Sequence, residues 1–227
     1  MESEYKPNFN KAKELANLYL LSSTVVDTFP YSICALVKEK TEIKCRTYQQ
    51  AQAIIQELKC EDLGSDDAML VEYKRKRIIL FNKEKYGQRV RFSIGHELGH
   101  HVMEHNLETS DKSILDVYEI EANFFSAQLL MPEEIINELI RRGKTISTDN
   151  IMRWFQVSRP AAKKRLDTFR RSDYIRRTQQ DKDMYDQLLL KYKSFIDSIA
   201  PITYYEEDEE EIQNNRNSWY SDRRRYY

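Results

Sequence analysis

All four histidines of this 227-residue chain fall within the ten residues from His96 to His105. Histidines that only pack a core are scattered along a sequence, so this clustering indicates a metal site. His96 and His100 are four residues apart, and on a helix they stand one above the other, where both can bind one Zn²⁺. Glu97 lies beside the first histidine and would reach a water molecule at the metal. The stretch His96-Glu-Leu-Gly-His100 therefore predicts the centre of a zinc hydrolase on a helix.

The same ten residues contain a second pattern. His101-Val-Met-Glu-His105 matches the inverted motif H-x-x-E-H, which also occurs in zinc peptidases. At about 100° per residue, His101 and His105 lie roughly 140° and 180° from His96, at the border of the apolar stripe of the helix. We therefore expect His101 and His105 to be core-edge or capping side chains and not ligands.

A catalytic zinc site needs a third protein ligand and one open position. The best source is Asp116–Pro132, which reads as a helix closed by a proline that opens the next one. On that helix Asn123 lies within about 40° of Glu119, whereas Glu121 lies about 200° away. We expect Glu119 to be the third ligand, with Glu121 as the alternative. Asn123 would then suit a hydrogen bond to a ligating histidine.

Small residues mark both predicted metal helices. Gly95 and Gly99 each cost the histidine helix about 1 kcal/mol relative to alanine, but they permit close packing or substrate approach. Ala122, Ser126 and Ala127 lie on the glutamate helix. We expect the two helices to approach each other closely at these residues.

Two longer motifs include these residues: Phe92-Ser-Ile-Gly-His-Glu-Leu-Gly-His100 and Glu119-Ile-Glu-Ala-Asn-Phe-Phe-Ser-Ala-Gln-Leu-Leu-Met-Pro132. Together they resemble the ImmA/IrrE family of zinc metallopeptidases, and Phe155–Leu166 is more weakly similar to the segment that closes that domain. The resemblance covers roughly residues 45 to 170. It implies a minimal gluzincin-like fold, a bound Zn²⁺, and proteolysis of a few protein partners, notably helix-turn-helix repressors of mobile elements or stress responses.

The resemblance also assigns roles to single residues. His96 and His100 match the ligand histidines, Glu97 matches the catalytic base, and Glu119 matches the ligand glutamate. Ser126 stands where alanine is expected, which leaves the catalytic residues unaffected.

Ala68–Tyr73 and Arg77–Asn82 are apolar, β-branched runs joined by a charged turn, which predicts a β-hairpin. The hairpin precedes the histidine helix, so its edge could hold an extended substrate as an added strand, or it could be only core. Lys83–Arg89 and Asn106–Ser113 read as loops. The helices expected elsewhere are Lys11–Leu21, Tyr31–Lys38, Gln49–Lys59, Glu133–Arg142, Thr148–Phe155, Ser158–Leu166 and Asp183–Ile199.

The expected fold class is α+β and mostly helical, with a small sheet beside the histidine helix. We assign residues 1–145 to a zincin-like metallopeptidase domain and 146–177 to a basic helix-turn-helix-like segment that closes it. Residues 178–204 form a C-terminal helix that packs back on the domain or on a second copy. Residues 205–227 carry blocks of acidic and basic charge, which predicts a disordered tail.

The charge distribution leaves a second function open. The formal net charge is −1, which gives no global attraction to nucleic acid, but Arg141–Arg177 carries twelve Lys or Arg against three Asp, a local charge of +9. That charge could contact DNA phosphates, dock an acidic partner or face solvent. The alternatives to a peptidase are therefore a DNA-binding regulator with a structural or sensory metal, and an interaction module that has lost turnover. The presence of Glu97 argues against the latter.

Several features favour a cytoplasmic protein. The chain has no run of about 18 apolar residues, and its start lacks the basic and apolar parts of a signal peptide. Cys34, Cys45 and Cys60 have no C-x-x-C spacing and read as inert thiols in a reducing compartment. We expect a protein substrate and no membrane contact, and the oligomeric state is open.

Overall fold

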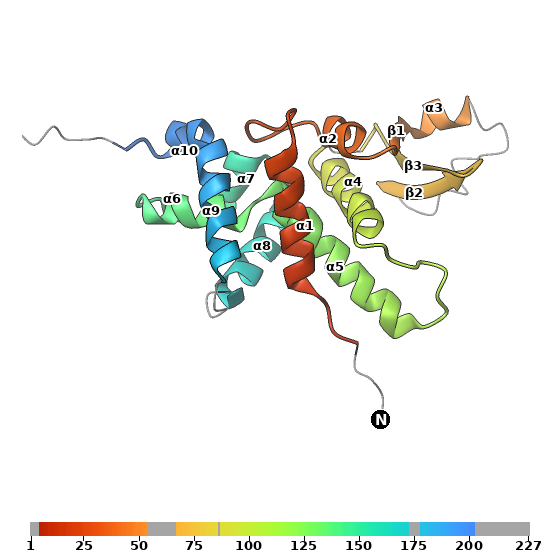
Figure 1. Ribbon diagram of the computed structural model, residues 1–227. Coiled ribbons are helices and arrows are strands. Elements are labelled where there is room, and N and C mark those ends of the chain that lie inside the picture. The colour runs from red at the N-terminus through yellow and green to blue at the C-terminus, as the bar shows by residue number, and fades with distance from the viewer. Residues whose placement is uncertain (1–4, 54–66, 86, 173–177, 203–227) are drawn as a thin grey trace, which may run out of the picture.

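The computed structural model describes residues 5–53, 67–85, 87–172 and 178–202 (Figure 1). The helices and strands in these ranges are α1 (Phe9–Ser22), α2 (Ile33–Lys40), β1 (Lys44–Thr47), α3 (Tyr48–Gln52), β2 (Ala68–Tyr73), β3 (Lys76–Phe81), α4 (Gly87–Val102), α5 (Lys112–Leu130), α6 (Glu133–Arg141), α7 (Thr148–Phe155), α8 (Arg159–Ser172), α9 (Gln179–Lys191) and α10 (Lys193–Ile199). The predicted fold class, α+β and mostly helical, is confirmed.

The sheet has the strand order β1-β3-β2, which leaves β2 at one edge. β2 and β3 form the predicted antiparallel hairpin, with Leu70 opposite Ile79. Lys74 and Arg75 connect them with positive φ angles of 51° and 62°, as in the two-residue type I′ turns that match the twist of a hairpin. β1 runs parallel to β3. The sheet lies beside α4, and its edge strand β2 contacts this helix (Figure 1).

Helices α4 and α5 pack backbone to backbone, as their small residues predict. A Cβ atom on Gly95 would lie 2.6 Å from the Ser126 hydroxyl, and one on Gly99 would lie 3.1 Å from the Ala122 Cα. The Ser126 hydroxyl donates to the Phe92 carbonyl at 2.8 Å. Gly95 faces Ser126, and Gly99, four residues later on α4, faces Ala122, four residues earlier on α5. The two helices therefore run antiparallel.

Two predicted helix starts were too late. α4 begins at Gly87, inside the predicted loop. α5 begins at Lys112, because Asp111 caps it by accepting from the Ser113 amide at 2.9 Å.

The prediction of one unbroken helix over Asp183–Ile199 was wrong, because Tyr192 interrupts it between α9 and α10. The buried Tyr192 hydroxyl donates to the carbonyls of Leu20 and Val26, at 3.1 Å and 3.3 Å. These contacts hold α9 against α1, so the C-terminal helices pack on the domain as expected.

Among the described residues, the main core runs from Ala12 in α1 to Ala200 after α10, and it includes Leu98 of α4 and Phe125 of α5. The proposed boundaries at residues 145 and 177 stay a prediction. Residues 54–59 of the helix expected over Gln49–Lys59, Cys60 and the tail at 205–227 lie outside the described residues. No helix in the described ranges is both long enough and apolar enough to cross a membrane.

The contact between α4 and α5 predicts that Gly99→Val lowers the free energy of unfolding by about 1–3 kcal/mol, because the added methyl groups meet the α5 backbone. Gly87→Val on the same helix is the control, since a Cβ there has no neighbour within 4 Å. Urea denaturation followed by circular dichroism measures both. Equal stability of the two variants would contradict the packing.

Candidate metal centre

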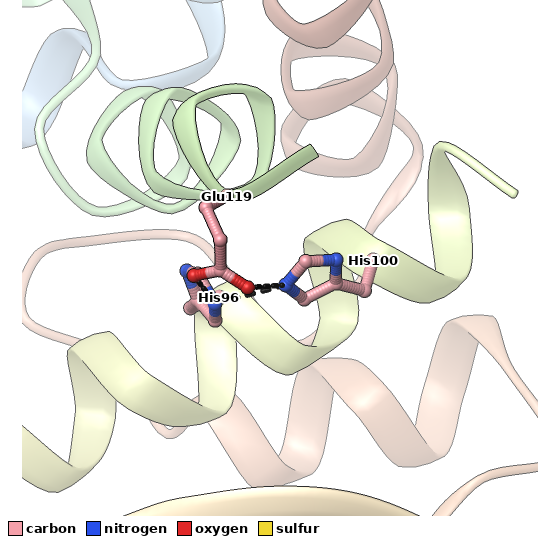
Figure 2. Close-up of side chains that lie close together, drawn as sticks. All are labelled: His96, His100 and Glu119. Carbon is pink, nitrogen blue, oxygen red and sulfur yellow. Dashed lines mark hydrogen bonds and ion pairs between the residues drawn. The ribbon is translucent and has the colours of Figure 1, made fainter. Parts of the chain in front are cut away.

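His96, His100 and Glu119 converge on one point between α4 and α5 (Figure 2). The two histidine Nε2 atoms lie 2.9 Å apart. Glu119 extends from α5 to both rings, with Oε2 at 3.3 Å from His96 Nε2 and Oε1 at 3.2 Å from His100 Nε2. Hydrogen bonding to His100 and then to His96 holds the pKa of the Glu119 carboxyl well below its usual range, so the carboxylate is ionised.

The spacing and chemistry of this cluster fit a zinc ion. Ligand atoms bound tetrahedrally at 2.0–2.1 Å from Zn²⁺ lie about 3.3 Å from one another, close to the observed separations. The cluster is closed toward the helices and open on the other side, since the side chain of His100 is 3% exposed and that of Glu119 is 56% exposed. This leaves room for the open fourth position of a catalytic site.

Glu97 lies next to the cluster in a partly buried position. Its Oε2 atom accepts a hydrogen bond from the Leu70 amide of β2 at 2.8 Å. Burial raises the pKa of the Glu97 carboxyl, although nearby His96 and the Leu70 amide oppose the shift. A carboxylate whose pKa is raised takes up a proton more readily than an exposed one.

Glu121 and the second histidine pair lie outside the cluster. His105 Nε2 is 2.9 Å from Glu121 Oε2, and the side chains of both are almost fully buried. The other ring nitrogen of His105, Nδ1, is 2.9 Å from Nδ1 of His100. Burial, followed by the neighbouring His100, lowers the pKa of His105 to about 4, so the ring is neutral at pH 7. His101 points toward β3, where its Nδ1 atom lies 2.8 Å from the Arg77 guanidinium.

The suggested role of Asn123 was wrong. Its side-chain amide donates to the Glu119 carbonyl one turn back on the same helix, at 2.7 Å. The side chain next to the Nδ1 atom of His100 is instead His105, which the sequence pattern placed only at the edge of the core.

A cavity of about 700 Å³ lies between α1, α5, α8 and α9, and none of the three cluster residues lines it. Phe92 and Asn123, which do line it, lie one helical turn from His96 and Glu119. The metal cluster is therefore a surface site beside this cavity and not part of it.

Comparisons with known proteins agree with this geometry. Residues 57–167 match the IrrE N-terminal-like domain of the peptidase M78 family. The metallopeptidase ImmA of Bacillus subtilis (strain 168) is 28% identical over 101 residues, which cover 42% of this chain and 60% of the relative. The matched part thus spans less than two thirds of that relative.

The convergence of three ligands predicts one metal ion per chain. His96→Ala and Glu119→Ala should each weaken Zn²⁺ binding by more than about 100-fold, because each removes a proposed ligand. Loss of a residue that only hydrogen-bonds to a ligand typically costs about 10- to 100-fold. His101→Ala, which lies outside the cluster, should bind as tightly as the wild type. Competition with a chromophoric chelator measures all three, and wild-type affinity in Glu119→Ala would exclude Glu119 as a ligand.

Proposed function

We propose that this chain, which resembles the ImmA/IrrE family of metallopeptidases over residues 57–167, is a zinc-dependent endopeptidase that cleaves a specific protein regulator. The convergence of His96, His100 and Glu119 on one point beside Glu97 is the observation that carries this proposal. His96, His100 and Glu119 would hold the metal, and Glu97 would be the catalytic base.

The chain's own residues supply the proton transfers of peptide hydrolysis. A bound Zn²⁺ would contribute Lewis-acid polarisation of the scissile carbonyl and acidification of a water molecule. Glu97 would accept the proton as that water attacks and would deliver it to the leaving amine. Burial raises the pKa of Glu97, which makes its carboxylate a stronger proton acceptor than an exposed glutamate.

The outer edge of β2 is placed to hold an extended substrate. The Leu70 amide points to Glu97 and not to β3, so this edge of the sheet faces the catalytic side of α4. A substrate segment that adds to the edge as another strand would receive main-chain hydrogen bonds beside the metal. This supports cleavage within an extended stretch of a protein.

The substrate that we propose is a helix-turn-helix repressor, as the family resemblance implies. Such a repressor works on DNA in the cytoplasm, so the protease would act there as well. Cleavage would release the genes of a mobile element or stress response from repression.

The arrangement of the basic segment gives less support to a DNA-binding regulator. Arg165 is buried, with its Nε donating to the Met131 carbonyl at 3.0 Å. Arg141 and Arg142 both bind Glu138, and Arg159 binds Asp149. These contacts remove several of the positive charges that a DNA backbone would need.

Incubation of the zinc-loaded protein with the repressor encoded beside its gene tests the proposal. We expect a single new fragment, and a rate about 10²- to 10⁴-fold lower for Glu97→Gln, which loses the proton acceptor. Glu97→Gln should bind as much zinc as the wild type, because Glu97 is not a ligand.

Glu108→Gln is the matched control, since Glu108 is an exposed carboxylate outside the cluster, and it should cleave at the wild-type rate. Cleavage by Glu97→Gln at that same rate would reject Glu97 as the base. Cleavage of fresh substrate by protein from which a chelator has removed the metal would reject the metallopeptidase assignment.

A further inference from the structure

We propose that His105 is a positioning residue for the metal ligand His100, that it acts together with Glu121, and that the segment leading into α1 completes this arrangement through the Asn8 amide. The inference rests on the proposed metal site and adds to it a set of outer contacts that controls how firmly the ligand is held.

A continuous line of hydrogen-bonding groups runs from the metal cluster to the N-terminal segment. His100 directs Nε2 to the cluster and Nδ1 to Nδ1 of His105, at 2.9 Å. His105 Nε2 lies 2.9 Å from one oxygen of Glu121. The other oxygen of Glu121 accepts from the Asn8 amide at 2.6 Å. Each group in this line has its partners within hydrogen-bond distance.

These contacts permit only one arrangement of protons on the two rings. When each ring carries one N–H, the hydrogen bond to the Glu121 oxygen is donated by His105 Nε2. Nδ1 of His105 then accepts, so His100 Nδ1 donates. That tautomer leaves the lone pair of His100 on Nε2, where a metal can bind it. His105 and Glu121 thus select the form of His100 that can be a ligand.

His105 is held firmly enough to orient its neighbour. Its side chain is 2% exposed, and its ring stacks on Tyr118 with centroids 4.2 Å apart and an interplanar angle of 11°. Its backbone amide donates to the His100 carbonyl at 3.0 Å. A ring fixed by stacking and by a backbone hydrogen bond cannot turn freely, so it restricts the rotation of His100.

The segment before α1 and the first turn of α1 contact this arrangement at three places. Besides the Asn8 amide on Glu121, the Tyr5 ring meets Tyr118 edge to face, with centroids 6.2 Å apart. Lys11 donates to the Met103 carbonyl in the turn before His105, at 3.3 Å. α1 also packs along α5 (Figure 1). These contacts join residues that are more than 90 positions apart in the sequence, and they couple the position of the N-terminal segment to His100.

Titration with Co²⁺, followed by its visible absorption, tests the role of His105. His105→Leu keeps an apolar side chain but loses both nitrogens, and it should bind Co²⁺ about 10- to 100-fold more weakly. His105→Asn places an oxygen acceptor near the position of Nδ1 and should recover part of that loss. His101→Leu is the control for removal of a neighbouring histidine and should bind like the wild type.

The outcomes separate this inference from the proposed function. If the wild type binds no Co²⁺, the metal site itself is rejected. If the wild type binds and His105→Leu binds equally well, only the positioning role is rejected. The same holds if folded His105→Asn binds no better than His105→Leu, because loss of packing alone would then explain the effect.

A second pair of variants tests the N-terminal contact without altering any histidine. Asn8→Ala and Asn8→Pro both lose the side-chain oxygen that caps α1, but only Asn8→Pro loses the amide that Glu121 accepts. We expect Asn8→Pro to bind Co²⁺ about 2- to 10-fold more weakly than Asn8→Ala, the range for loss of one hydrogen bond. Equal affinities would reject the coupling of this segment to the site.

Discussion

Close packing between α4 and α5 is the constraint on which the proposed centre depends. A Cβ atom added at Gly99 would lie 3.1 Å from the Cα of Ala122, so the two helices are too close at this point for a larger residue to fit without a shift. At this separation the short side chain of Glu119 spans from α5 to both His96 and His100. The glycines weaken the helix when it is considered alone. They nevertheless allow His96, His100 and Glu119 to meet from two helices, so the stability of α4 by itself is lower where the proposed site requires close packing.

Features set by regular backbone geometry could be predicted from the sequence. The spacing of His96 and His100 fixes their relative position on any helix. The angle between Glu119 and Glu121 separated them correctly onto two sides of α5, one exposed at the cluster and one buried against His105. The hairpin was equally predictable, because its alternation and charged turn are local signals. These predictions depend on near neighbours in the chain.

The parts that could not be predicted depend on where regular geometry ends or on distant contacts. α4 ends at Val102 and Glu104 has a positive φ of 61°, so a helical angle does not describe His105. The turn brings His105 back to His100, and no periodicity signals it. Asn8 reaches Glu121 across 113 residues. Arg165 looked like part of a solvated basic run, yet it is buried against the Met131 carbonyl, a contact that only the tertiary fold creates.

The two sides of the cluster are built for different tasks. A metal ligand must keep one tautomer and one orientation, and under the proposal the buried, stacked His105 would provide both for His100. A catalytic base must instead change protonation state and move between water and leaving group. As the proposed base, Glu97 would meet that need, because its hydrogen bond comes from the Leu70 amide at the edge of a strand. In the proposed hydrolysis, a fixed ligand and a base that can exchange a proton are both needed, and the fold provides them with different neighbours: His105 for His100 and the edge of β2 for Glu97.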